Sequence, residues 1–353
     1  MRAPIAKVVS PAPRDIWENL IEQDSSVLVS QTPGWIDAMR AMGYRDASRL
    51  YEMANGRQMV LPLVRRAGLP AGLARYMSFP NGWGIGGLVT SDGEQRCEDM
   101  AAVLDDLAEH TGVGVSIRPN PLHCREWAAS DRPGIVTVPR YAHVLDLEGG
   151  FAKVWMQRFK SSKRTAVRKA KQSGIQVECD SSGSLVTVFY ELWERSLTRW
   201  ASQQHEPVWL TRLRGLQRDP ILKFDLMAKH LKGACHIWVA RRKGEPIAAI
   251  VVLQGANAHA TRAVMNEELA GPVRASDLLH CCAIEAACKA GCRHYHFGES
   301  GQSKALAQFK GSFGAEGYAY AEYRLERLPI TPVDQWARCL VKRAIGFKDV
   351  PET

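Results

Sequence analysis

Residues 295–325 read YHFGESGQSKALAQFKGSFGAEGYAYAEYRL, and the interpretation of the whole chain depends on this stretch. Its centre, FKGSFG at 309–314, places one lysine between two phenylalanines and two glycines, after a Gly-Glu turn. Phe309 and Phe313 are four residues apart and would anchor the segment on a core, which would direct Lys310 toward a cleft. A surface lysine needs no such setting, whereas a lysine that meets a phosphate, a carboxylate or a developing oxyanion does.

The length and composition predict a globular protein of two domains with anionic partners. At 353 residues the chain exceeds the usual size of a single hydrophobic core. Apolar residues make up 46% and charged residues 24%, which is typical of folded proteins rather than disordered ones. The formal charge of +9 favours nucleic acid, phosphates or an acidic precursor as partners.

The sequence predicts a cytoplasmic protein without stable membrane insertion. No apolar run approaches the roughly 20 residues that span a bilayer, and the start, MRAPIAKVVSPAPRDIW, lacks the apolar segment of a secretory signal. Nine unevenly spaced cysteines are typical of reduced thiols. Three of them, Cys281, Cys288 and Cys292, fall on the apolar stripe of a predicted helix, and no metal site is predicted there.

An α/β rhythm occurs twice along the chain. The first half contains a hairpin at Asn55-Gly56, a helix within 94–111 and a following strand. The second half repeats it with helices at 151–172, 185–200 and 276–290 and a hairpin at Lys243-Gly244-Glu245. This duplication predicts an α/β fold of two domains, 1–147 and 148–329, each a mixed sheet flanked by helices. A C-terminal helix within 330–353 is expected to pack on the first domain.

The segments SQTPGW, GRQMVLPLV, KRTAVRKAKQSG, GEPIAAIVVL, YHFGESG and FKGSFG, in this order over roughly residues 27–325, resemble the FemAB-like family. The most specific are R-K-A-x-x-x-G, from Arg168 to Gly174, and F-K-x-x-F-G. Because members of that family consist of two tandem GNAT-type acyltransferase domains, the resemblance implies this fold. Relatives with a tRNA-handling arm carry two long charged helices in the second domain; this chain resembles the shorter, armless form.

The resemblance implies an acyltransferase that forms an amide bond, as FemX-type enzymes do when they add an amino acid from a charged tRNA to a peptidoglycan precursor. Aminoacyl-tRNA would then be the co-substrate, an amine the acceptor, and no cofactor would be needed. The matching lysine of relatives lies close to the acyl-transfer centre, so Lys310 is the expected oxyanion stabiliser. Glu299 is the candidate base for the attacking amine, or else it caps the following turn.

A basic helix is the predicted contact for tRNA or phosphate. Residues 158–171 contain seven basic residues and no acidic one, and like charges on one helix face repel each other unless an anion meets them. The candidates are Lys160, Lys163, Arg164, Arg168 and Lys169. A solvated lysine-rich helix is the alternative for this segment, and a non-catalytic nucleic-acid-binding module is the alternative for the whole protein.

An acyl-CoA donor is a further alternative. GNAT enzymes that use CoA wrap its pyrophosphate in a glycine-rich turn at a helix N-terminus. The corresponding segment here, EELAGPVRASDLL at 267–279, has one glycine followed by Pro272, which offers no amide hydrogen. The segment RRAGLPAGLA at 65–74 is also interrupted by proline. Neither loop suits CoA, and Arg274 remains as a lone cation.

The remaining candidates concern the acceptor. Trp83 lies among glycines in SFPNGWGIGGLV and would either stack on a flat or sugar-like ligand or pin the turn against the protein. Arg262, Arg274 and Phe309 complete the predicted substrate-binding set.

Overall fold

The computed structural model describes residues 4–80, 82–110, 112–130, 134–301, 303–344 and 347. The chain divides into two compact units, Met1–Tyr141 with Tyr318–Gln335, and Ala142–Gly317 with Trp336–Thr353. These limits differ from the predicted ones because the chain returns to the first unit near its end. Strand β15 (Glu316–Glu326) pairs antiparallel with β8 (Gly114–Ile117) of that unit.

The first unit contains a four-stranded sheet in the order β1-β3-β4-β7. Its strands are Ile5–Val9, Arg49–Met53, Gln58–Leu61 and Val89–Thr90. Strands β3 and β4 form the predicted hairpin, and Gly56 at its turn has a φ of 82°, which favours glycine.

A second set of strands in this unit is ordered β15-β8-β6-β5-β2, with β6 at Arg75–Met77, β5 at Val64–Arg66 and β2 at Tyr44–Asp46. Helices α1 (Arg14–Gln23), α2 (Pro33–Ala41), α3 (Cys97–His110) and α4 (Cys124–Ala129) complete the unit. The predicted helix within 94–111 is therefore confirmed. The core joins Met100, Val103 and Leu107 of α3 to Trp127 of α4 and to buried strand residues.

The second unit is built on strands in the order β10-β11-β12-β13-β14-β9. They span Ile175–Asp180, Cys235–Arg242, Glu245–Gln254, Ala258–Met265, His294–Glu299 and Ile135–Asp146. Strands β11 and β12 form the predicted hairpin at Lys243-Gly244. Strand β12 carries the run IAAIVVL at 247–253, all of it buried. Such a run is typical of a strand covered on both faces.

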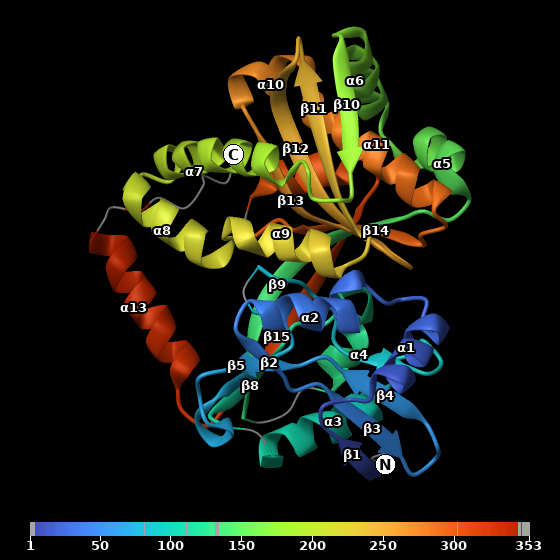
Figure 1. The fold of residues 1–353 in the computed structure, drawn as a ribbon, viewed down its shortest axis with the longest axis vertical. Helices are drawn as coiled ribbons and strands as arrows, with labels where there is room; N and C mark the ends of the chain where they lie inside the picture. Colours follow the sequence, from blue (N-terminus) through green and yellow to red (C-terminus); the bar gives the residue numbers. More distant parts are fainter. Residues whose placement is uncertain are drawn as a thin grey trace. The chain divides into compact units, whose positions relative to one another are not determined.

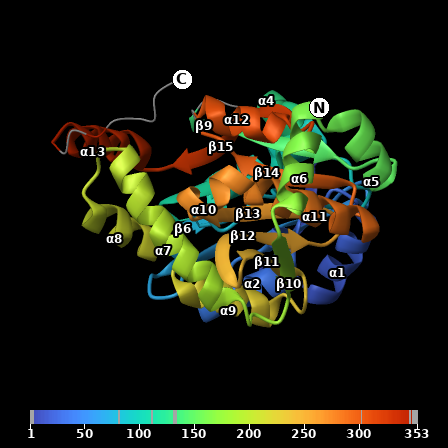
Figure 2. The ribbon, with the colours of Figure 1, turned by 90° about the horizontal axis from the view of Figure 1, so that it is seen from above.

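Helices cover both faces of these strands, as Figures 1 and 2 show. Ala248, Ile250 and Val252 of β12 belong to one core with α6 (Ser161–Gln172) and α11 (Ala275–Lys289). The alternate residues point to the opposite face, where α7 (Val186–Gln203) and α9 (Ile221–His230) pack. Cys281 and Cys292 are buried in the first of these cores, which confirms the predicted apolar role of these cysteines.

The predicted helix at 151–172 is interrupted. It consists of α5 (Gly150–Lys153), a π-helical turn at Val154–Arg158 and α6, separated by extended backbone at Phe159. Two helices at 208–230 had no counterpart in the sequence interpretation: α8 (Val208–Arg218) and α9. Helix α10 (Glu267–Val273) precedes α11, and α12 (Lys304–Gly311) carries Lys310.

The C-terminal helix α13 (Ile330–Ala344) is present where a helix was expected, and Thr331 in its first turn is buried. Every residue from 332 to 341 is exposed. The apolar side chains of this helix therefore lie outside the hydrophobic cores. Within the part of the chain that the structure describes, no helix is long and apolar enough to cross a bilayer.

Candidate active site

The backbone at the carboxyl end of β14 leaves the regular pairing of the sheet. Strands β13 and β14 run parallel but pair only at Ala258 with Tyr295 and at His259 with His296. On its other side β14 pairs with β9, and the register shifts between His296 and Gly298. Gly298 has a φ of 71°, a conformation that favours glycine. Carbonyl groups at this strand end are thereby available to side chains.

Lys310 uses these carbonyl groups. Its Nζ donates to the carbonyl oxygens of Gly298 at 2.9 Å and Glu299 at 2.8 Å, and the residue is only 5% exposed. Burial lowers the pKa of Lys310 to about 7, although the negative charge of Glu299 acts in the opposite direction. An ammonium group whose pKa lies near neutrality is typical of a functional lysine rather than a surface one.

Phe309 and Phe313, on either side of Lys310 in the sequence, pack against each other as predicted, and Lys163 lies over both rings. The rings of Phe309 and Phe313 lie 5.3 Å apart, and Phe313 is fully buried. The Nζ of Lys163 lies 4.2 Å and 4.4 Å from the centroids of these rings and forms an ion pair with Asp277. Lys163 is therefore buried in the core and is not part of a cationic face. Phe309 contacts this lysine.

Three histidines lie within electrostatic range of Lys310, namely His143, His259 and His280, and the sequence analysis named none of them as a site residue. His143 on β9 has its Nδ1 2.8 Å from the hydroxyl oxygen of Ser300. Burial, and then the charge of Lys310, lowers the pKa of His143 to about 4. Burial, together with Arg262 and Lys310, lowers the pKa of His259 to about 3. Both imidazoles are neutral at pH 7. The 157 residues between His143 and Ser300 hide this pair from local patterns.

Arg262 forms an ion pair with the buried carboxylate of Asp219. Its Nε and Nη2 lie 3.0 Å and 2.8 Å from the two carboxylate oxygens of Asp219, which is fully buried. Lys223 and Arg218 also contact this carboxylate, each at 2.7 Å. Burial opposes ionisation, but the surrounding cations hold the pKa of Asp219 well below its usual range. Substrate binding, predicted for Arg262, would compete with this pairing.

The N-terminus of α11 already holds an anion. Arg274, at a φ of 59°, caps this helix and is exposed. Asp277 lies in the first turn, is buried and pairs with Lys163. A carboxylate at this position occupies the favourable end of the helix dipole. Pro272 lies inside α10, immediately upstream.

The basic helix keeps part of its predicted face. Lys160, Arg168 and Lys169 are exposed on α6 or at its start. Arg164 is instead half-buried, and its Nη1 donates to the carbonyl oxygens of Trp155, Met156 and Phe159 at 3.3, 3.2 and 2.5 Å. These groups end the preceding π-helical turn, so Arg164 stabilises the break in the helix.

Trp83, in the first unit, is only 4% exposed and packs edge to face against Trp35, with centroids 5.9 Å apart. Of the two roles considered for this tryptophan, the geometry matches the one that pins a turn.

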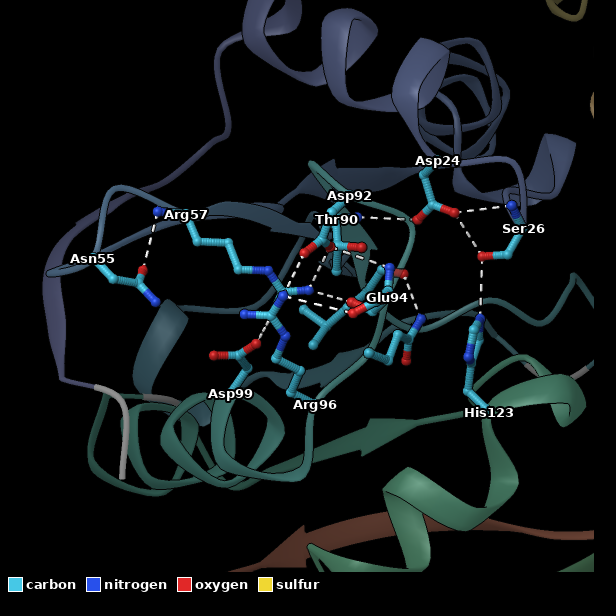
Figure 3. A network of polar contacts seen from close by, with 12 residues as sticks. Asp24, Ser26, Asn55, Arg57, Thr90, Asp92, Glu94, Arg96, Asp99 and His123 are labelled. Atoms are coloured by element: carbon cyan, nitrogen blue, oxygen red, sulfur yellow. Dashed lines mark hydrogen bonds and ion pairs between the residues drawn. The ribbon is translucent and has the colours of Figure 1, made fainter. Parts of the chain in front are cut away.

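A polar network in the first unit, shown in Figure 3, places Ser26 between Asp24 and His123. The hydroxyl oxygen of Ser26 lies 2.6 Å from the Asp24 carboxylate and 3.1 Å from Nε2 of His123. The carboxylate can only accept, so Ser26 donates to Asp24, and His123 then donates to Ser26. This order leaves His123 unable to act as a base toward Ser26. The buried Arg57, paired with Asp92 and Asp99, belongs to the same structural network.

Comparisons with known proteins agree with this architecture. Residues 157–318 match the family described as Acetyltransferase (GNAT) domain. The crystal structure of FemX is similar with a TM-score of 0.60 and 13% identity, over 94% of this chain and 99% of that one. No curated protein matches the sequence.

Two further structures have lower scores. The C-terminal domain of a putative lysylphosphatidylglycerol synthetase from Agrobacterium fabrum has a TM-score of 0.49 and 12% identity, over 95% of this chain and 98% of that one. A tandem GNAT protein from the clavulanic acid biosynthesis pathway has a TM-score of 0.47 and 13% identity, over 92% and 99%. The domain match identifies a GNAT domain in the second half of the chain and supports an acyltransferase. The similarity to FemX confirms the predicted fold class.

Proposed function

We propose that the protein is an N-acyltransferase that joins the aminoacyl group of a charged tRNA to an amine acceptor. The observation that carries the proposal is the position of Lys310. Its buried Nζ contacts the carbonyl oxygens of Gly298 and Glu299, where β13 and β14 no longer pair. A cation fixed beside backbone that a ligand can approach suits the stabilisation of an oxyanion.

The reaction requires few groups. The acceptor amine attacks the ester carbonyl of the donor, a C–N bond forms, and the tetrahedral intermediate carries negative charge on oxygen. Lys310 stabilises this charge. When the intermediate collapses, the C–O bond breaks and the tRNA hydroxyl leaves with a proton. The amine loses its proton to a base, for which Glu299 and the neutral His143 are the nearby candidates.

The choice of donor depends on two features of the second unit. The exposed Lys160, Arg168 and Lys169 can contact a phosphate backbone. The segment before α11, where a pyrophosphate would otherwise bind, contains Pro272, which offers no amide hydrogen. Both features favour tRNA over CoA. An acyl-CoA donor is the second candidate, and the match to an acetyltransferase domain favours it.

A donor-consumption assay tests the proposal. The protein is incubated with a pool of charged tRNA and a panel of amines, and in parallel with acyl-CoAs, and the loss of each donor is measured. We expect deacylation of tRNA that depends on added amine and forms an amide product. Consumption of an acyl-CoA alone would favour the second candidate. Tight tRNA binding without any product would indicate a binding module instead.

A further inference from the structure

The imidazole of His259 is a buried polar group that the proposed reaction does not yet use. Its neighbours on β13, Ala258 and Ala260, belong to the core with α6 and α11, so His259 points to the opposite face of the sheet. The residue is 7% exposed. Within the described part of the chain, its Nδ1 is shut off from solvent and has no hydrogen-bond partner. An apolar side chain would fill such a position at lower cost, so the imidazole indicates a role other than packing.

The other ring nitrogen of His259 lies beside the strand end at which Lys310 binds. Strands β13 and β14 pair as far as His259 and His296, and Gly298 follows with a φ of 71°. A Cβ at Gly298 would lie 3.7 Å from Nε2 of His259 and 3.6 Å from the carbonyl oxygen of Ala260. Because residue 298 is glycine, the space next to Nε2 carries no side chain. The carbonyl group of this same glycine accepts from Lys310.

The charges around His259 keep its imidazole neutral. Burial, and then the positive charges of Arg262 and Lys310, lower the pKa of His259 to about 3. A neutral imidazole has one N–H group and one lone pair. A buried N–H group without an acceptor is rare, so the proton belongs on Nε2 and the lone pair on the enclosed Nδ1. Such a group is too weak a base to take a proton from an amine at neutral pH, but it can donate a hydrogen bond.

We propose that His259 is a further catalytic residue, whose Nε2–H donates a hydrogen bond to the carbonyl oxygen of the acyl donor beside the ammonium group of Lys310. This hydrogen bond strengthens as negative charge develops on the oxygen, and the proton stays on Nε2 throughout. The role rests on the proposed acyl transfer. It does not depend on the donor, because the ester of a charged tRNA and the thioester of an acyl-CoA both present a carbonyl oxygen.

Three substitutions of His259 separate the two ring nitrogens. Glutamine places an amide N–H near the position of Nε2, asparagine places one near Nδ1, and phenylalanine fills the volume without a donor. We expect His259→Phe and His259→Asn to lower kcat by about 10² with little change in KM, because the hydrogen bond acts mainly in the transition state. His259→Gln should stay within about tenfold of the wild type. The measurement is turnover in the donor-consumption assay, with the donor that the wild type uses.

Two comparisons exclude a structural cause. His236→Phe, on β11, is the control histidine and should leave kcat unchanged. The melting temperature of His259→Phe should equal or exceed that of the wild type, because the variant removes an unpaired buried polar atom.

Nitrogen NMR of the histidine side chains tests the same assignment without any turnover. Between about pH 5 and pH 8, where an ordinary histidine titrates, His259 should remain neutral with its proton on Nε2. Addition of a stable donor analogue, 3′-amino-3′-deoxyadenosine acylated with alanine, should shift the Nε2 resonance of His259.

Several results would overturn the role of His259. They are near-normal kcat in His259→Phe, equal losses in His259→Gln and His259→Phe, and protonation of His259 between pH 5 and pH 8. A wild type that consumes neither charged tRNA nor acyl-CoA would instead contradict the proposed function. In that case the analogue decides for His259: a shift of Nε2 supports the contact with a carbonyl group, and an unchanged resonance excludes it.

Discussion

Lys310 shows how a single residue becomes functional through its surroundings. Burying an ammonium group is costly unless hydrogen bonds compensate. Here two backbone carbonyls accept its protons, yet the pKa of Lys310 still falls to about 7. Only one turn away, Phe313 is fully buried and holds α12 in place. Packing and these two hydrogen bonds thus fix the position of the Lys310 ammonium group.

Replacement of Lys310 by methionine tests a role in the chemical step. Methionine keeps the length and the apolar stem, so packing should change little. If Lys310 stabilises the oxyanion, Lys310→Met should lower turnover by about 10² or more. The measurement is turnover per folded molecule in the donor-consumption assay. Phe309→Ala is the contrasting variant, expected to lower the free energy of unfolding by about 3 kcal/mol through a cavity. Near-normal turnover in Lys310→Met would make Lys310 structural.

The pH dependence gives a second test of Lys310. The group is a cation below its pKa of about 7 and neutral above it. Catalysis that needs the cation should therefore decline as pH rises through about 7, whereas ionisation of the acceptor amine acts in the opposite direction. Lys310→Arg keeps its charge throughout, so this decline should disappear from the pH profile of the variant. A decline that persists in Lys310→Arg belongs to another group.

The burial of Lys163 could not be predicted from the sequence. Its charge and its place in a basic run resemble those of Lys160, yet the structure buries it between Asp277 and two aromatic rings. The partner carboxylate is 114 residues away in the sequence. Charge patterns within one helix cannot reveal such a pair, because they contain no information on the facing helix.

At the scale of elements, the break between the π-helical turn and α6 is coupled to the segment after Lys310. The backbone nitrogen of Lys160 donates to the carbonyl of Ser312 at 3.0 Å. Gly314, at a φ of 83°, lies so close that a Cβ would be 2.5 Å from the carbonyl oxygen of Arg158. Hydrophobic periodicity predicted one continuous helix here, since it does not register a contact with a distant glycine.

Two glycines three residues apart provide a matched test of this contact. Gly314→Ala meets both an unfavourable φ and a backbone clash, so it should lower the free energy of unfolding by about 2 kcal/mol or more. Gly311→Ala lies in α12, where a Cβ would have no atom within 4 Å, and should be neutral or stabilising by up to about 1 kcal/mol. Urea denaturation measures both. Equal effects of the two substitutions would contradict the coupling.

Helix α6 supplies the test of the tRNA interaction. Lys160→Ala/Arg168→Ala removes two exposed cations and should weaken tRNA binding. The slope of log K against log salt should flatten by about one unit for each phosphate that the variant no longer binds. The control is Arg45→Ala, an exposed cation on β2. Unchanged affinity at several salt concentrations would show that the basic side chains of α6 face solvent and do not bind tRNA.

At the scale of the molecule, the sequence was sufficient for the α/β class and the two hairpins, because each turn has its own glycine signal. The limits of the two units were not predictable in the same way. They depend on β15 returning to pair with β8, some 200 residues earlier in the chain. The site was unpredictable for the same reason, because His143 on β9 and Ser300 after β14 are distant in the sequence and meet only where these strands pair.

The position of α11 in the GNAT domain allows a prediction about the donor that the protein accepts. A GNAT domain is expected to bind CoA if the helix after the central strands offers free amide groups to a pyrophosphate. In this chain that helix, α11, has Asp277 paired with Lys163 in its first turn and follows α10, which contains Pro272. Pro272 has no amide hydrogen that could bind a pyrophosphate there. Calorimetry should therefore give a dissociation constant for CoA weaker than about 100 μM, near −5.5 kcal/mol. The same preparation should bind charged tRNA, which serves as the control for folded protein. A low-micromolar dissociation constant for CoA would reverse the order of the two donors.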